Sequence, residues 1–303
     1  MRRLSAFLAP LLLCFLCASP AAHAATDAGG NLAGLASFLD KATPAPNRKA
    51  IFDVWTKSAL AGDADAQYLV GSLYRRGDAV VPHVVEQDSN QARRYLSTAA
   101  AHGRLLAMAK MAEIELADDH PLEAMIWAQV YGAYRGWVGN DERGYGPNNE
   151  RQPTLYFEDL LRRASRRLVQ KFGDDRTEDV LAGLNRFVAE HDKEVRAQLV
   201  TAGLSPAWLG PQLPFENAKS MKRVGVDLRN TVSEWVLTFA ADGSVAAAEV
   251  LDAIPVFIHA NGHRALVTQY RAAPAEKGAP ERLTMKVVDL RKVDWPVGPV
   301  RTH

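Results

Sequence analysis

The stretch Ala61-Gly-Asp-Ala-Asp-Ala-Gln-Tyr-Leu-Val-Gly-Ser-Leu-Tyr74 is the most informative part of the sequence, because it is echoed later by His102-Gly-Arg-Leu-Leu-Ala-Met-Ala-Lys-Met-Ala-Glu-Ile-Glu115. Small residues fall at matching places in the two copies: Gly62 with Gly103, Ala66 with Ala107, and Gly71 with Ala112. Recurring small residues let helices pack closely in a stack, where each helix buries a face that it cannot bury alone. The echo therefore predicts stacked helices, which offer a surface to a partner more often than they build a catalytic pocket.

The helices on either side of these copies share one spacing of bulky and small residues. The pattern is i, i+3, i+7, and its members are Phe52, Trp55, Ala59; Ala92, Tyr95, Ala99; and Ala124, Trp127, Tyr131. This spacing places each set on one face of a helix. Together with helices near residues 64–75 and 104–117, the pattern predicts two helical hairpins and part of a third.

Two groups of residues resemble the Sel-one-like repeat, a branch of the tetratricopeptide superfamily. One half of the motif is matched by Gly62, Ala64, Ala66, Gln67, Gly71 and Tyr74, and the other half by Ala92, Tyr95, Ala99, Ala100 and Gly103. The match spans residues 50–136, and the second copy departs from the motif at Met108 and Ala112. The resemblance implies a concave protein-binding groove, for which Tyr74, Tyr95 and Tyr131 are the candidate lining residues. Aromatic residues at this spacing are more often core residues, and generic Ala-rich helices remain the alternative.

Two further helices are predicted after a turn-rich loop at residues 138–153. The first runs from Thr154 to Phe172, between Pro153 and Gly173, and the second runs from Glu178 to Leu199 after the possible N-cap Thr177. The first helix carries a basic cluster: Arg162, Arg163, Arg166, Arg167 and Lys171. We interpret this cluster as a solvated face paired with nearby acids, since exposed charge runs usually are. Binding to anionic lipid or to an acidic patch on a partner is the alternative.

The spacing of apolar residues changes from a helical to a strand period after residues 205–214, which hold three prolines. Glu234–Ala240 reads as a strand with Trp235, Leu237 and Phe239 on one face, followed by a hairpin turn at Ala241-Asp242-Gly243-Ser244. Val245–Leu251 is then the second strand, residues 255–270 a helix opened by Pro255, and Arg282–Leu290 a third strand. This order predicts a helix packed on a small antiparallel sheet.

The same residues resemble the C-terminal domain of the TonB family. The matches, in order, are Phe239, residues 241–245, Val250, Pro255, Phe257, residues 270–271, residues 274–275, Gly278 and Pro280. Departures are Ala253 in the place of Ser and Tyr270 in the place of Trp. The resemblance implies that an extended peptide adds to a sheet edge, with an outer-membrane receptor or another envelope protein as the partner. The last strand is the candidate edge, with Leu283, Met285 and Val287 as candidate binding residues. An unrelated small α+β domain is the alternative.

The N-terminus reads as a secretion signal. Arg2 and Arg3 precede a mostly apolar run from Leu4 to Cys17, and Ala22-His23-Ala24 is a signal-peptidase site with cleavage expected before Ala25. The run is shorter than the roughly 20 residues that a membrane span needs, so membrane contact is expected only if the leader is uncleaved. Cleavage would also remove both cysteines, leaving a chain without a thiol or disulfide. The formal net charge of +1 gives no electrostatic case for nucleic acid as a partner.

No arrangement of residues supports an enzyme or a cofactor site. His259 and His263 have helical spacing, but no third metal ligand is evident. Glu190-His191-Asp192 lies within one predicted helix, where adjacent residues do not face each other. His102 falls at a turn, and no phosphate loop, dinucleotide fingerprint or nucleophile elbow occurs. We therefore predict no catalytic residues, no metal and no cofactor.

The prediction is an α+β multidomain protein, with α/α solenoid-like helical repeat hairpins followed by a small strand-strand-helix-strand domain. The expected segments are a signal peptide at 1–24, linkers at 25–49 and 205–230, a helical repeat domain at 50–204 and a TonB-like domain at 231–303. The function expected is a periplasmic, non-enzymatic interaction scaffold that binds protein partners and no nucleic acid. Alternatives are a membrane-anchored TonB-like energy transducer and a cell-wall-associated enzyme.

Overall fold

A computed structural model of the chain describes residues 28–138, 154–173, 176–202, 215–217, 230–256 and 267–290. These residues form an α+β structure with eight α-helices and a three-stranded antiparallel sheet. The helices are α1 (Ala28–Leu39), α2 (Ala45–Leu60), α3 (Ala64–Arg76), α4 (Ser89–Ala101), α5 (Leu105–Ala117), α6 (Pro121–Val138), α7 (Thr154–Phe172) and α8 (Thr177–Ala202). The strands are β1 (Phe215–Asn217), β2 (Thr231–Phe239), β3 (Val245–Ile254), β4 (Tyr270–Ala272) and β5 (Arg282–Leu290).

The helix-to-helix turns that carry the sequence echo share a glycine with positive φ, and the first turn also has a side-chain cap. Gly62 follows α2 with φ +98°, and Gly103 follows α4 with φ +81°, a conformation that favours glycine. Asp63 then caps α3, since its side chain accepts hydrogen bonds from the backbone N–H groups of residues 65 and 66. The small residue at Gly71 lets α3 approach α4 closely, because a Cβ there would lie 2.7 Å from Leu96 Cγ.

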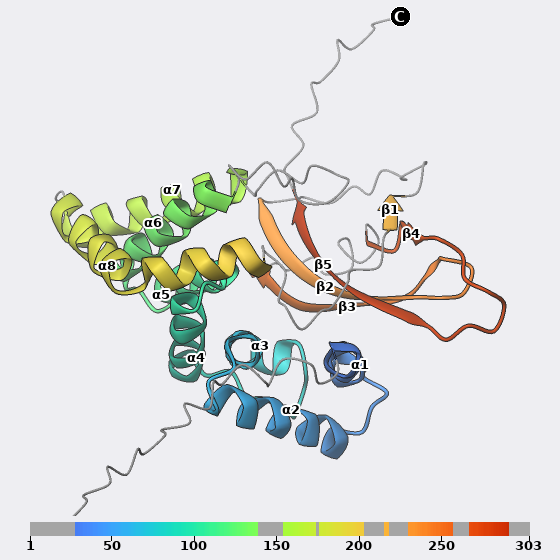
Figure 1. Cartoon of the computed structure of the whole chain (residues 1–303). Coiled ribbons are helices and arrows are strands. Elements are labelled where there is room, and N and C mark those ends of the chain that lie inside the picture. Colours follow the sequence, from blue (N-terminus) through green and yellow to red (C-terminus); the bar gives the residue numbers. More distant parts are fainter. Residues whose placement is uncertain are drawn as a thin grey trace, which may run out of the picture.

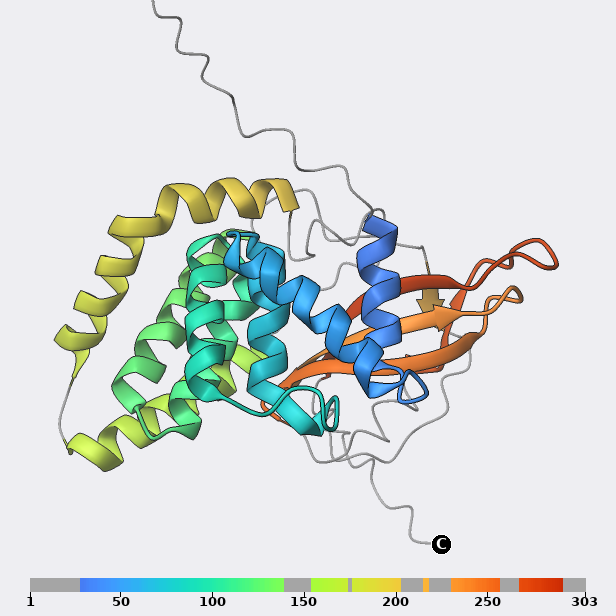
Figure 2. The same ribbon diagram turned by 90° about the horizontal axis from the view of Figure 1, so that it is seen from below.

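Helix α1 is part of the core, in a segment that the sequence analysis assigned to a linker. Leu35 and Phe38 are fully buried, and the ring of Phe38 lies 5.0 Å from that of Trp55 on α2. The Ala- and Gly-rich composition suggested flexibility, but the apolar residues of this segment recur on one helix face. Figures 1 and 2 both show α1 lying against the sheet, which it contacts through all three strands.

The sheet has the strand order β3-β2-β5, with both neighbouring pairs antiparallel. The predicted hairpin joins β2 to β3: Gly243 has φ +82°, and the Asp242 carboxylate accepts a hydrogen bond from the Ser244 N–H at 2.8 Å. Residue pairs Glu234↔Asp252 and Trp235↔Val250 leave Leu251 as an extra residue in β3. This β-bulge shifts the alternation of β3, and Asp252 thereby lies opposite Glu234 on the helix-facing side.

Strand β2 is buried on both faces and contributes to three cores. Trp235, Leu237 and Phe239 share one core on the face away from the helices, as their spacing predicted. On the other face, Val232 and Val236 belong to the two large cores that the helices form. Helices and strands thus share two of these cores, and the division into a helical domain and a C-terminal domain stays a prediction.

The helices lie along one side of the sheet and extend beyond it, as Figures 1 and 2 show. α6, α7 and α8 form the far end of the helical part, whereas α1, α2 and α3 lie beneath the sheet in the view of Figure 1. No helix among the described residues is both long and apolar enough to cross a membrane.

Several predictions concern residues outside the described ranges. These are the leader at residues 1–24, most of the loop at 138–153, and most of the linker at 205–230 and of the helix at 255–270. At the described end of that predicted helix, Val267 is helical, and residues 270–272 form strand β4, which pairs with β1.

Candidate functional site

The three tyrosines predicted to line a helical groove lie inside or at the edge of the core. Tyr131 is fully buried, and its ring packs edge-on at 6.1 Å from that of Tyr156. Tyr95 is 6% exposed, and its ring stacks on that of the half-buried Tyr74 at 6.0 Å. Their role in the structure is helix packing, as is most often the case for aromatic residues at helical spacing.

The three candidate residues of the last strand lie in β5, which is an edge of the three-stranded sheet. Among the described strands, β5 pairs with β2 alone. Met285 is buried and Leu283 half-buried, and both pack in the core shared with α1 and α2. Val287 pairs with Glu234 in the backbone ladder. The side chains of Leu283 and Met285 therefore face the protein, so any partner of this edge would meet the main chain of β5.

A buried ionic cluster joins the helices to the sheet, and we call it the ionic joint. Its residues are Tyr68, Ser72 and Arg75 of α3, Lys110 of α5, Glu234 of β2 and Asp252 of β3. All six side chains are at least nine-tenths buried. The joint connects residues that are far apart in the sequence, so it forms only when helices and sheet are both in place.

Lys110 is the centre of the ionic joint. Its Nζ lies 2.7 Å from Ser72 Oγ, 3.0 Å from Asp252 Oδ2 and 2.5 Å from Glu234 Oε2, and it sits over the ring of Tyr68. The Tyr68 hydroxyl donates to the other oxygen of Glu234 at 2.6 Å. All three donors of the ammonium thus have acceptors, as a buried lysine requires.

Arg75 and Asp252 make the second half of the ionic joint. The guanidinium donates to both carboxylate oxygens of Asp252 and, at 2.6 Å, to the carbonyl oxygen of Ala253. Arg76 lies on the other side of the same carboxylate, 3.7 Å away. A bidentate arginine fixes the geometry of its carboxylate as well as neutralising it.

The pKa values of the joint follow from burial and from these partners. Burial alone would raise the pKa of Asp252, but Arg75, Lys110 and Arg76 lower it to about 2. The pKa of Tyr68 is raised, first by burial and then by the neighbouring Glu234. Asp252 is therefore ionised and Tyr68 neutral at any physiological pH, which is the arrangement of a fixed structural contact rather than of a proton donor or acceptor.

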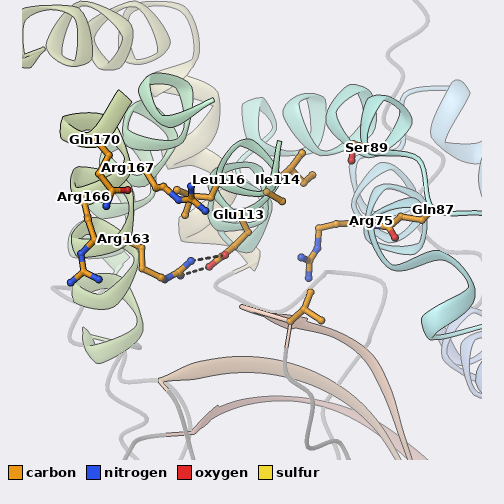
Figure 3. A pocket seen from close by; sticks show the side chains of 12 residues that line it. Arg75, Gln87, Ser89, Glu113, Ile114, Leu116, Arg163, Arg166, Arg167 and Gln170 are labelled. Carbon is orange, nitrogen blue, oxygen red and sulfur yellow. Dashed lines mark hydrogen bonds and ion pairs between the residues drawn. The ribbon is translucent and has the colours of Figure 1, made fainter. Parts of the chain in front are cut away.

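A second buried cluster lies next to the ionic joint, between α5 and α7. Arg163 donates to both oxygens of Glu113, at 2.6 and 2.9 Å, and to Asp159 at 2.8 Å. The hydroxyl of the fully buried Tyr156 donates to Glu113 as well, at 2.9 Å. Figure 3 shows Arg163 and Glu113 at the wall of a cavity of about 440 Å³ that also reaches Arg75.

The histidine candidates for metal or acid–base chemistry form no site among the described residues. His102, at the end of α4, contacts Glu194 of α8, and His191 packs against Phe187 and lies 3.6 Å from the carboxylate of its neighbour Glu190. Asp192 accepts hydrogen bonds from Tyr134 and Arg196 and does not face His191 as a catalytic partner would. His259 and His263 lie outside the described residues. No group of three metal-ligating side chains occurs in the part of the chain that the structure describes.

Sequence reasoning missed every residue of the ionic joint. The signal was present, because Lys110 interrupts the apolar run Leu105-Leu-Ala-Met-Ala-Lys-Met111, and Glu234 and Asp252 interrupt apolar strands. A charge at a core position predicts a buried partner, although the sequence does not say which one.

No family model, curated protein or solved structure matches the chain. The functional argument therefore rests on the residues and their geometry.

Proposed function

We propose that the chain is a non-enzymatic protein-interaction scaffold of the cell envelope, in which the helices hold a small sheet whose outer strand accepts an extended peptide. The observation that carries this proposal is the position of β5, which is bonded to β2 on one side and to no other described strand. An edge strand presents a row of N–H and C=O groups that can pair with another chain.

The contacts that hold the sheet against the helices support the same function. Strand β2 lies between β5 and β3 and is tied to α3 and α5 through Glu234, while Asp252 ties β3 to α3. Since β5 pairs with β2 along its whole length, the position of the edge follows the position of the helices. A fixed edge loses less conformational freedom on binding than a mobile one, which favours affinity.

The mode of binding follows from how β5 uses its own side chains. Leu283 and Met285 pack inward, so main-chain hydrogen bonds would supply most of the contact with an added peptide. Such binding depends on an extended backbone and tolerates many side chains. This agrees with the implication of the resemblance to the TonB C-terminal domain, in which an envelope protein or an outer-membrane receptor supplies the peptide.

The envelope location in this proposal rests on the sequence. A basic start, a short apolar run and an Ala-x-Ala site are typical of secretion, and no cysteine follows Cys17. A periplasmic chain of this size needs no disulfide, because its core is large. The helical repeats and the TonB-like resemblance belong to the same proposal.

Peptide selection followed by N-methylation tests the proposed function. The purified full chain is used to select binders from a random peptide library, and one binder is then N-methylated at each backbone position in turn. Because every second residue of an added antiparallel strand points its N–H at the edge, methylation of one alternate set should abolish binding and the other set should be tolerated. Binders that tolerate methylation at all positions, or that show no alternation, would contradict the proposal. Alanine substitution at the same positions is the control for side-chain contacts.

A further inference from the structure

The cavity between α3, α5 and α7 has a strongly basic wall. Arg163, Arg166, Arg167 and Gln170 line it from α7 at positions i, i+3, i+4 and i+7, which lie on one face of that helix. Arg75 lines the side formed by α3. Figure 3 shows Arg163 and Arg167 extending from α7 toward α5, with Arg75 across the cavity.

Two of these arginines are neutralised and held in place by the protein itself. Arg75 is bound by Asp252, and Arg163 by Glu113 and Asp159. Arg75 is also more than nine-tenths buried. These pairs give the cavity a rigid wall whose geometry is set before any ligand arrives.

Arg166 and Arg167 are different, because neither has a carboxylate within ion-pair distance among the described residues. The other members of the α7 basic cluster do have such partners: Arg162 contacts Asp159, and Lys171 contacts Asp119. Within the described residues, the expectation of a face paired with nearby acids is met by Arg162, Arg163 and Lys171. The two remaining charges lie next to each other and within one helical turn of Arg163, where like charges repel.

The remaining walls of the cavity determine how large and how polar a ligand can be. Ile114 and Leu116 of α5 and Val256 after β3 supply apolar surface, and Ser89 and Gln87 supply polar groups. A volume of about 440 Å³ exceeds that of a single inorganic anion and falls within the range of small-molecule pockets. Arginine pairs recognise phosphate and carboxylate groups through paired, charge-assisted hydrogen bonds.

We infer that this cavity binds a small molecule that carries phosphate or carboxylate groups, held by Arg166 and Arg167 and packed against the apolar wall of α5. The ligand oxyanions take the place of the carboxylate partners that Arg166 and Arg167 lack among the described residues. The site is separate from the edge of β5, so it adds a second, small-molecule function to the scaffold.

Titration calorimetry with pyrophosphate and with citrate tests this inference on the full chain. The variant R166Q/R167Q removes the two uncompensated charges, and R162Q/K171Q is the matched control, because it removes two positive charges from the same helix outside the cavity. We expect the wild-type chain to bind at least one of the two anions, R166Q/R167Q to weaken that binding about tenfold or more, and R162Q/K171Q to change it by about twofold at most. All four side chains are at least partly exposed, and circular dichroism verifies that the variants fold.

A second arm distinguishes a free ligand from a lipid headgroup. Vesicles of phosphatidylglycerol and of phosphatidylcholine are sedimented with the same three proteins. Binding to phosphatidylglycerol that pyrophosphate displaces, and that only R166Q/R167Q loses, supports the cavity with a headgroup as its source of phosphate. Failure of the wild-type chain to bind either soluble anion overturns the inference. So does equal weakening in the two double variants, which would indicate general charge attraction.

Discussion

Lys110 and Asp252 illustrate how few residues fix the arrangement of this molecule. Each is a charged side chain with almost no exposed surface, and each is surrounded by groups of the opposite charge or by hydrogen-bonding partners. Taking such charges out of water costs several kcal/mol per ion, so the contacts must be nearly complete for the fold to persist. Removal of one partner should therefore be costly.

Asp252→Asn should destabilise the chain in a pH-dependent way. Because the folded-state pKa of Asp252 is about 2 and an unfolded aspartate has a pKa of about 3.9, its contribution to stability is present above pH 4 and is lost as the pH falls toward 2. We expect a loss of about 2–3 kcal/mol at pH 7, shrinking toward pH 2, in urea unfolding followed by circular dichroism.

The control for this variant is Asp53→Asn, on the exposed face of α2, where the ion pair with Lys49 is solvated. It should change the free energy of unfolding by less than about 0.5 kcal/mol at any pH. A constant difference between Asp252→Asn and wild type from pH 7 to pH 2 would argue against the ionised carboxylate as the stabilising group.

Lys110→Met should destabilise the chain by about 3–5 kcal/mol, since it leaves two carboxylates in the interior with one cation fewer. The double variant Lys110→Met/Glu234→Gln removes one charge of each sign and should cost less than the sum of the single variants. Urea unfolding of all four proteins forms a double-mutant cycle, in which we expect a coupling energy of about 1–3 kcal/mol. Additive effects would show that the two side chains do not interact.

At the scale of the elements, the turns between helices are equivalent in backbone but not in surroundings. A Cβ at Gly62 meets nothing within 4 Å, whereas a Cβ at Gly103 would lie 2.8 Å from Gln198 Cβ and 3.0 Å from the carbonyl oxygen of Val195. Helix α8 therefore packs directly against the turn after α4. This gives a matched pair of substitutions.

Gly62→Ala should cost about 1–2 kcal/mol, the strain of an alanine with positive φ. Gly103→Ala should cost a further 1–3 kcal/mol or so, because the new methyl group displaces α8. Urea unfolding gives the two energies, and hydrogen exchange of residues 195–202 reports on α8. Equal costs, with unchanged exchange in α8, would contradict this packing.

Sequence patterns predicted some elements well and others poorly, for physical reasons. The bounds of α7 and β5 agree with prediction, since both segments have strong stop signals at their ends. The Asp242-Gly243 hairpin was predicted because that dipeptide suits a tight turn. The core role of α1 was missed because Ala and Gly dominate its composition. The ionic joint was missed because its partners come together only through tertiary packing.

At the scale of the whole molecule, helices and sheet share their interior. The two largest cores each contain residues from both, including Val232 and Ile254 in one and Val236 and Leu251 in the other. Together with the ionic joint, this favours one cooperative folding unit, which suits a scaffold that must present an edge strand in a fixed place.

The N-terminus of the native protein distinguishes the scaffold from an anchored energy transducer. We expect mass spectrometry of the protein purified from its own cells to find a chain that begins at Ala25, because the apolar run is short and ends in an Ala-x-Ala site. An intact leader, recovered with the membrane fraction, would favour the transducer instead.

Hydrogen exchange of the full chain, with and without a selected extended peptide, shows whether β5 accepts an added strand. If the peptide adds to β5, amides within residues 282–290 should exchange more slowly in the complex, while amides of α3 and α5 stay as they are. Unchanged exchange in β5, with protection confined to the helices, would contradict the account.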